Sequence, residues 1–142
     1  MLFLLLVIAP YTVASTVSDY MARTEILRDM ANFTDTVADN RLVTQQNLED
    51  FTLNISSHGM IVSPEITKYT LVTNPKPGST NEIAYTLVKQ EGEVGAGTEF
   101  VKGDYIVVRV KSLGYNGAQR IIMGILNAFY PTFDCTLPCR IR

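Results

Sequence analysis

The sequence predicts an α+β fold in which a long N-terminal helix, apolar and then amphipathic, packs on a small antiparallel β-sheet head. No charged side chain precedes Asp19, and apolar residues at helical spacing continue to about Asn40 without a turn signal. Segments rich in β-branched and aromatic residues follow in the second half. We therefore expect an N-terminal assembly or membrane helix, residues 1–40, and a small α+β globular head, residues 41–142.

Composition restricts the classes of function. The chain has 142 residues and a net charge of −2, with acidic and basic side chains mixed along it. That distribution gives no electrostatic footprint for a nucleic acid partner. No polybasic cluster adjoins the apolar start, so we expect no specific partner among anionic lipids.

The apolar start from Met1 to Val17 has three interpretations. A cleaved signal peptide would need a basic n-region, which is missing, although Val13-Ala14-Ser15 is a weak cleavage site. A membrane-spanning helix needs ~20 apolar residues, with a lower limit of ~17, so this stretch is a short anchor. Pro10 lies inside it, and a proline within a helix is tolerated where neighbours satisfy the freed carbonyl. The third interpretation is the core of a bundle of identical chains.

A second pattern begins inside this stretch and favours a bundle. Its members are spaced four, three, four and three residues apart, a mean period of 3.5 that is typical of helices packed side by side. Most are small or medium-sized, which allows close approach of helices. They are Val13, Val17, Tyr20, Thr24, Leu27, Ala31, Thr34 and Ala38. Off this seam, Asp19 with Arg23 and Glu25 with Arg28 have the spacing of helical ion pairs.

The first 40 residues resemble the N-terminal part of the type IV pilin superfamily, above all the pilin-like and pseudopilin-like subunits of Tad-type systems. The resemblance rests on an uncharged apolar helix, an internal proline (Pro10) and an amphipathic continuation, Met21-Ala-Arg-Thr-Glu-Ile-Leu-Arg28. Many type IV pilins carry a glutamate near the mature start, where this chain has Leu5. The resemblance implies a pilin-like fold and cleavage by a prepilin peptidase just before Met1.

The head begins with a second predicted helix, from Gln45 to His58. Thr44 is the expected N-cap and Gly59 the expected residue after the end. Leu48, Phe51 and Ile55 would form its buried stripe. His58, the only histidine, is expected to cap carbonyls or face solvent rather than bind a metal.

Three strands are predicted next: Ile66–Thr73, Glu82–Gln90 and Tyr105–Lys111. In the last of these, Ile106, Val108 and Val110 should face the core. The turn-rich stretch Asn74–Asn81 joins the first two strands. The glycines in Glu91–Glu99 are in the order G-x-x-G-x-G, which favours a flexible hairpin loop over a phosphate site.

The sequence after the third strand predicts a turn and then a short helix. Asn116-Gly117 has turn chemistry. Apolar residues at helical spacing follow and end at Pro131: Ile121, Ile122, Ile125, Leu126 and Phe129.

Cys135 and Cys139 have three interpretations. A disulfide is favoured in an oxidising compartment and would agree with an extracellular head, with Pro138 helping the turn. Half of a zinc site is disfavoured because the chain has one histidine and no further cysteine. The third interpretation is two reduced thiols.

Asn32-Phe-Thr34 and Asn54-Ile-Ser56 fit the N-glycosylation pattern, so Asn32 and Asn54 are candidate sites if the organism glycosylates exported proteins. The preferred interpretation is that both are ordinary polar residues on helix surfaces. No nucleophile–base pair, paired carboxylates or metal-ligand cluster is evident, so we predict that the chain is not an enzyme and has no cofactor.

These patterns lead to one functional prediction and two alternatives. The prediction is a structural subunit (pilin) of an extracellular helical filament at the cell surface, a homopolymer that forms through the N-terminal helix. Before assembly the subunit would be inserted in the cytoplasmic membrane and handled by a pilus assembly machinery. The assembly residues would be the seam from Val13 to Ala31, with Pro10 and the apolar start Met1, Leu2, Phe3, Leu4, Leu5, Leu6, Val7 and Ile8.

The first alternative is a membrane-anchored minor pilin or accessory protein of a secretion or conjugation machine. The second is a secreted binding module whose ligands contact the loops Asn74–Asn81 and Glu91–Glu99.

Overall fold

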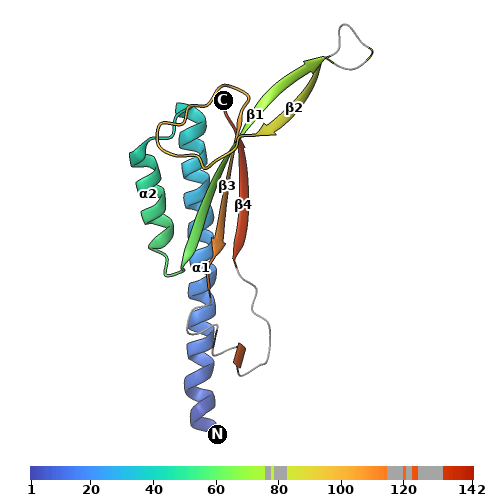
Figure 1. The fold of residues 1–142 in the computed structure, drawn as a ribbon. Helices are drawn as coiled ribbons and strands as arrows, with labels where there is room; N and C mark the ends of the chain where they lie inside the picture. Colours follow the sequence, from blue (N-terminus) through green and yellow to red (C-terminus); the bar gives the residue numbers. More distant parts are fainter. Residues whose placement is uncertain (76–77, 79–82, 115–119, 121–122, 125–132) are drawn as a thin grey trace.

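A computed structural model confirms the α+β fold, with a long N-terminal helix packed on a four-stranded antiparallel sheet (Figure 1). It describes residues 1–75, 78, 83–114, 120, 123–124 and 133–142. The elements are α1 (Leu2–Asn40), α2 (Gln45–Ser56), β1 (Val62–Pro75), β2 (Ile83–Lys89), β3 (Tyr105–Ser112) and β4 (Asp134–Arg140).

Helix α1 runs through Pro10 without interruption and extends well beyond the head at its N-terminal end (Figure 1). It ends at Arg41, whose φ of 57° is left-handed and whose N–H donates to Val37 O at 2.7 Å. The last residues of the chain close against this end. Arg41 Nε donates to Arg142 O at 2.7 Å, and the Arg142 guanidinium pairs with Asp35 and Asp39 on α1.

Helix α2 begins as predicted, because the Thr44 hydroxyl accepts a hydrogen bond from Asn47 N–H at 3.1 Å. It ends at Ser56, two residues before the predicted end. The Ser57 hydroxyl and N–H both donate to Asn54 O, and such short polar side chains compete with helical bonding. Gly59 follows with a φ of 80°, the conformation that its predicted role required.

The strands lie in the order β2-β1-β3-β4, and β1 is shared between two parts of the sheet. Its first half, from Val62 to Tyr69, pairs with β3, and its second half, from Tyr69 to Pro75, pairs with β2. The β1–β2 hairpin therefore projects away from the helices as an arm (Figure 1). Both strands were predicted, but β1 begins four residues earlier than expected.

Strand β4 pairs with β3 along its whole length, although Pro138 lies inside it. Ser112 N–H donates to Phe133 O, and Ile141 N–H donates to Asp104 O. Bonded pairs alternate along an antiparallel ladder, so these two bonds place the nitrogen of Pro138 on the outer, unpaired side of β4. A proline at this position costs no ladder hydrogen bond and hinders pairing with a further strand.

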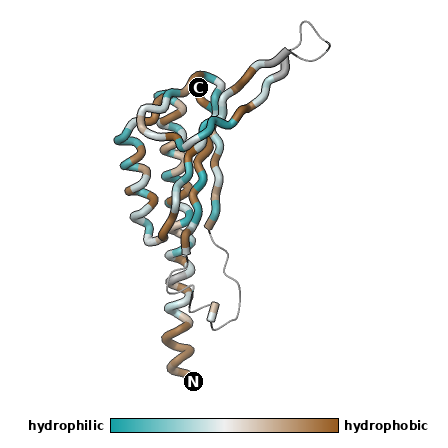
Figure 2. Tube along the Cα trace, viewed as in Figure 1, coloured by the Kyte–Doolittle hydropathy of each residue, from teal (hydrophilic) through white to brown (hydrophobic). Residues whose placement is uncertain are grey.

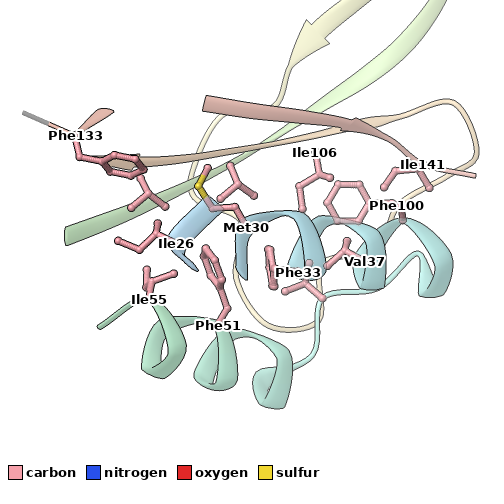
Figure 3. Packing of buried hydrophobic residues seen from close by; sticks show 14 residues of the cluster. Ile26, Met30, Phe33, Val37, Phe51, Ile55, Phe100, Ile106, Phe133 and Ile141 are labelled. Atoms are coloured by element: carbon pink, nitrogen blue, oxygen red, sulfur yellow. The ribbon is translucent and has the colours of Figure 1, made fainter. Parts of the chain in front are cut away.

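The core lies between the sheet and the two helices (Figure 3). Helix α1 contributes Ile26, Met30, Phe33 and Val37, and the Phe33 ring stacks on Phe51 of α2 with centroids 4.5 Å apart. As the alternation in β3 predicted, Ile106, Val108 and Val110 are buried against this layer.

The glycine-containing segment Glu91–Glu99 is anchored, which differs from the flexible hairpin expected. Gly97 N–H donates to Val43 O at 2.7 Å, and Val43 N–H donates to Thr98 O at 3.0 Å. The segment thereby covers the connection between α1 and α2. The predicted turn at Asn116-Gly117 and most of the predicted helix between Ile121 and Phe129 lie outside the described residues, as does most of the Asn74–Asn81 loop.

Candidate assembly surface on the N-terminal helix

Helix α1 buries one face against its own head only from Asp19 onward. The buried positions on this face recur every three or four residues and form one stripe. They are Asp19, Ala22, Ile26, Met30, Phe33 and Val37. Among the described residues, the head therefore covers one side of the second half of the helix, whereas the first half is mostly exposed.

Figure 2 shows that apolar residues dominate the N-terminal turns of α1, which extend beyond the head. The side chains described in this half are exposed to solvent, apart from the half-buried Ile8 and Thr12. Burial of apolar surface is worth ~25 cal/mol per Å², so an exposed helix of this composition indicates a contact with lipid or another protein. The exposed large side chains are Met1, Leu2, Phe3, Leu4, Leu5, Leu6, Val7, Tyr11, Val13 and Val17.

The predicted seam continues this exposed surface up the helix. Val13, Val17, Tyr20, Thr24 and Leu27 are exposed, and Ala31 is half-buried. We call these six residues the assembly stripe. Val13, Val17, Tyr20 and Thr24 lie on the side of α1 away from the face that packs on the head, and Leu27 lies at the flank of that face. Among the described residues, the stripe is therefore open to a second helix as far as Leu27.

The C-terminal end of the predicted seam is not exposed, because Thr34 and Ala38 are buried in the subunit itself. A repeat of 3.5 residues drifts around a straight α-helix by ~20° per heptad, so the seam turns by about 60° between Val13 and Thr34. The end of the chain also covers this flank, since Arg142 N–H donates to Ala38 O at 3.4 Å. The available stripe therefore ends near Ala31.

The boundary between the free and packed halves of α1 is marked by an ion pair. Asp19 Oδ2 accepts from Arg23 Nε at 2.9 Å, and the Arg23 guanidinium also lies over the Phe133 ring at 5.8 Å. The predicted pair between Glu25 and Arg28 forms as well. The first charged side chain of the helix is thus neutralised where the head begins.

His58 does not cap carbonyls, and the expectation of a capping or solvated role is wrong. Its Nε2 lies 2.6 Å from Asp29 Oδ2, and both side chains are largely buried. The pair connects the end of α2 to α1. A partner 29 positions away in the sequence could not be identified from local patterns.

The two candidate glycosylation residues both line one groove of about 160 Å³ between α1 and α2. Asn32 and Asn54 are exposed, but each is followed by a buried residue, Phe33 or Ile55, and Thr34 is buried too. The folded chain therefore presents neither acceptor pattern as an open segment. This geometry favours the interpretation of both as polar helix-surface residues.

The predicted disulfide between Cys135 and Cys139 is absent, and both cysteines are free and half-buried. Both lie in β4, four residues apart. At a rise of ~3.3 Å per residue their Cα atoms are about 13 Å apart, well beyond the ~7 Å that a disulfide can bridge. The expectation failed because it placed Pro138 in a turn, whereas the proline lies on the outer edge of a strand.

The state of these cysteines leads to a testable prediction. Burial raises the pKa of both thiols, so less reactive thiolate is present at a given pH. We expect both to react with iodoacetamide without prior reduction, and more slowly than in the urea-unfolded chain at the same pH. Mass spectrometry of samples quenched at timed intervals measures this. Cysteines that react only after reduction would restore the disulfide interpretation.

Within the described residues, no group of three or more His, Cys, Asp or Glu side chains could hold a metal ion. The predictions of no cofactor and no enzymatic activity remain predictions. In the same part of the chain, α1 is long and apolar enough to cross a membrane, a test that signal sequences also pass. Comparison with models of protein families, with curated proteins and with solved structures finds no match to this chain.

Sequence reasoning missed two exposed apolar residues at the end of the head from which α1 emerges, Ile61 and Leu113. Each is next to a strand end, so each seemed part of an ordinary strand boundary. Only the fold brings them together, since Leu113 N–H donates to Ile61 O at 2.9 Å.

Proposed function

We propose that this chain is a structural subunit of an extracellular helical filament and that it polymerises through α1. The observation that carries the proposal is the exposed apolar surface of α1, which runs from Met1 through the assembly stripe to Leu27. The resemblance of residues 1–40 to type IV pilins adds support, as does the packing of the second half of α1 on an antiparallel sheet.

The proposed assembly places α1 helices of many copies side by side in a filament core, with the heads outside. Apolar burial between copies drives it, at ~25 cal/mol per Å². A contact between the stripe of one copy and a different surface of the next does not close on itself, and its repetition gives a helical polymer. Before assembly, α1 rests in the cytoplasmic membrane, and a pilus assembly machinery transfers the subunit to the filament.

Electron microscopy of the purified full chain tests this proposal. The chain is kept in detergent, the detergent is removed by dialysis, and the sample is imaged. We expect fibres of uniform diameter. A protein that remains monomeric in detergent and forms only amorphous aggregates or lipid-bound monomers after dialysis would contradict the filament proposal.

A second candidate is a membrane-anchored accessory subunit, and the observation that favours it is the length and composition of α1, which suit a single membrane span. In that case α1 remains in the bilayer permanently. Quantitative mass spectrometry of isolated filaments separates the two candidates, because a main subunit dominates the filament whereas an accessory protein is present in a few copies.

A further inference from the structure

The β1–β2 arm is a two-stranded ribbon that projects beyond the rest of the sheet (Figure 1). In β2, Tyr85, Thr86, Leu87 and Val88 are all exposed, and successive side chains of a strand lie on opposite faces, so both faces of β2 contact solvent. An isolated two-stranded ribbon is marginally stable at best in water, and a further strand or a packed face stabilises it. The arm therefore has the features of a segment that gains a partner strand.

The outer edge of β2 has unpaired backbone groups. Gln90 N–H donates to Lys68 O at 2.9 Å, so these two residues form a hydrogen-bonded pair of the ladder. Bonded and non-bonded pairs alternate, and the register places Tyr85, Leu87 and Lys89 at non-bonded positions. Their N–H and C=O groups point away from β1. Among the described residues no strand lies beyond β2, so these groups are available to an added strand.

Each of the other edges of the sheet contains a proline. Lys68 O points to the β2 side of β1, and so does the nitrogen of Pro64, four residues earlier, where β2 has ended. The nitrogen of Pro75, seven residues later, points to the other side, beyond the end of β3. Pro138 has the corresponding position on β4. A proline nitrogen cannot donate to a further strand, so β2 is the one outer edge in the described part of the sheet that is not blocked in this way.

The partner that fits this edge is β2 of a second copy, because the prolines disfavour the other edges of that copy. Antiparallel pairing of two β2 strands over their whole length places Thr86 opposite its own copy. Tyr85 is then opposite Leu87 at two positions, and cross-strand pairs of an aromatic and an aliphatic side chain stabilise a sheet. Lys89, the one charged residue of the strand, lies at opposite ends of the two strands, so like charges do not meet.

We propose that β2 is an adhesive edge through which the arms of two copies join into one four-stranded sheet in the order β1-β2-β2-β1. The contact is isologous, with a two-fold axis between Thr86 and its copy. The pairing itself does not depend on α1, whereas its role in fibres rests on the proposed function.

The symmetry of this contact determines which copies it joins. Heads on the surface of one helical fibre are related by rotation about the fibre axis and translation along it. Two such heads do not face each other across a two-fold axis. The joined copies therefore belong to different fibres, and the arms hold these fibres side by side.

Cysteine cross-linking of the full chain tests the pairing. In a background with Cys135→Ser and Cys139→Ser, Thr86→Cys places a thiol at the centre of the contact. Cα atoms of a non-hydrogen-bonded pair are ~4.5 Å apart, within the range of a disulfide. Thr70→Cys is the matched control, because Thr70 is exposed on β1 of the same arm but would be three strand spacings, about 14 Å, from its copy. Each variant is oxidised with copper phenanthroline in detergent, before fibres form, and again after detergent removal.

Leu87→Pro tests the edge in fibres. The nitrogen of Leu87 points away from β1, so the substitution removes no hydrogen bond within the arm and closes the edge as Pro138 does on β4. Leu87→Val keeps the N–H and is the matched control. Electron microscopy after detergent removal should show fibres side by side for the wild-type chain and Leu87→Val, and single fibres for Leu87→Pro.

We expect Thr86→Cys to form dimers severalfold faster than Thr70→Cys in detergent and in fibres. If no variant forms fibres, the proposed filament fails, and cross-linking in detergent still decides whether the arms pair. Equal cross-linking of the two variants, or Leu87→Pro fibres that remain side by side, would overturn the inference. Thr86→Cys dimers in fibres that stay single would place the contact within one fibre, which also overturns it.

Discussion

Val17→Arg is expected to abolish fibre formation while leaving the head folded. Val17 is the second residue of the assembly stripe, is 49% exposed in the subunit and lies outside the buried core. In a packed bundle, an arginine there would bury an unpaired charge, which costs several kcal/mol at each repeated contact. In the membrane, an arginine near the end of the span extends to the interface, so insertion should survive.

Sedimentation and negative-stain imaging after detergent removal measure the effect, with tyrosine near-ultraviolet circular dichroism as the check on folding. Leu53→Arg is the matched control, because Leu53 is an exposed apolar residue on α2, away from the stripe. We expect normal fibres from the control. Normal fibres from Val17→Arg would show that the stripe is not part of the contact between copies. Loss of fibres in both variants would show that an added positive charge prevents assembly wherever it is placed.

Local signals were sufficient for much of the fold. The alternation in β3 correctly placed Ile106, Val108 and Val110 in the core, and Thr44 caps α2 as its side chain and position indicated. These features depend on neighbours within a few residues, where helix and strand periodicity acts directly. Helix α1 was equally clear, because its apolar residues continue over many turns without a break.

Features that depend on partners distant in the sequence could not be predicted from the sequence. The pairing of His58 with Asp29 requires the return of α2 along α1. The extended conformation of Cys135 and Cys139 follows from the pairing of β4 with β3, which outweighs the turn preference of Pro138. The sequence could not show at which residue the seam becomes buried in the subunit itself. The burial of Thr34 and Ala38 depends on the packing of the C-terminal residues against α1.

Helix α1 carries two stripes, and the sequence could not decide which faces the head. Ile26, Met30 and Phe33 form one, and Val17, Thr24 and Leu27 belong to the other. Both are compatible with packing on a sheet and with packing on another helix. The structure assigns the first to the head. Adjacent residues of α1 should therefore have separable roles, and Ile26 and Leu27 provide the test.

Ile26→Ala should destabilise the head, because Ile26 is fully buried in the core. Truncation of a buried isoleucine to alanine costs about 2–5 kcal/mol through lost burial and the cavity left behind. Leu27→Ala removes a side chain that is 40% exposed in the subunit, and its cost to the fold should be within about 0.5 kcal/mol. Amide hydrogen exchange of β3 in detergent compares the two variants, and we expect exchange about 30-fold faster or more in Ile26→Ala alone.

Assembly should respond to Leu27→Ala with little change in the fold. Truncation to alanine removes three carbons, each worth ~0.8 kcal/mol when buried. Because 40% of Leu27 is exposed in the subunit, burial between copies adds about 1 kcal/mol, and its loss should raise the critical concentration for fibres about fivefold. Pelleting assays over a concentration series measure this quantity. If Leu27→Ala leaves the critical concentration unchanged while Val17→Arg prevents assembly, the contact between copies ends below Leu27 and the heads pack further apart than the stripe predicts. Equal destabilisation of β3 by both variants would instead mean that Leu27 packs on the head in solution. Helix α1 would then have no separate stripe for contact with another copy.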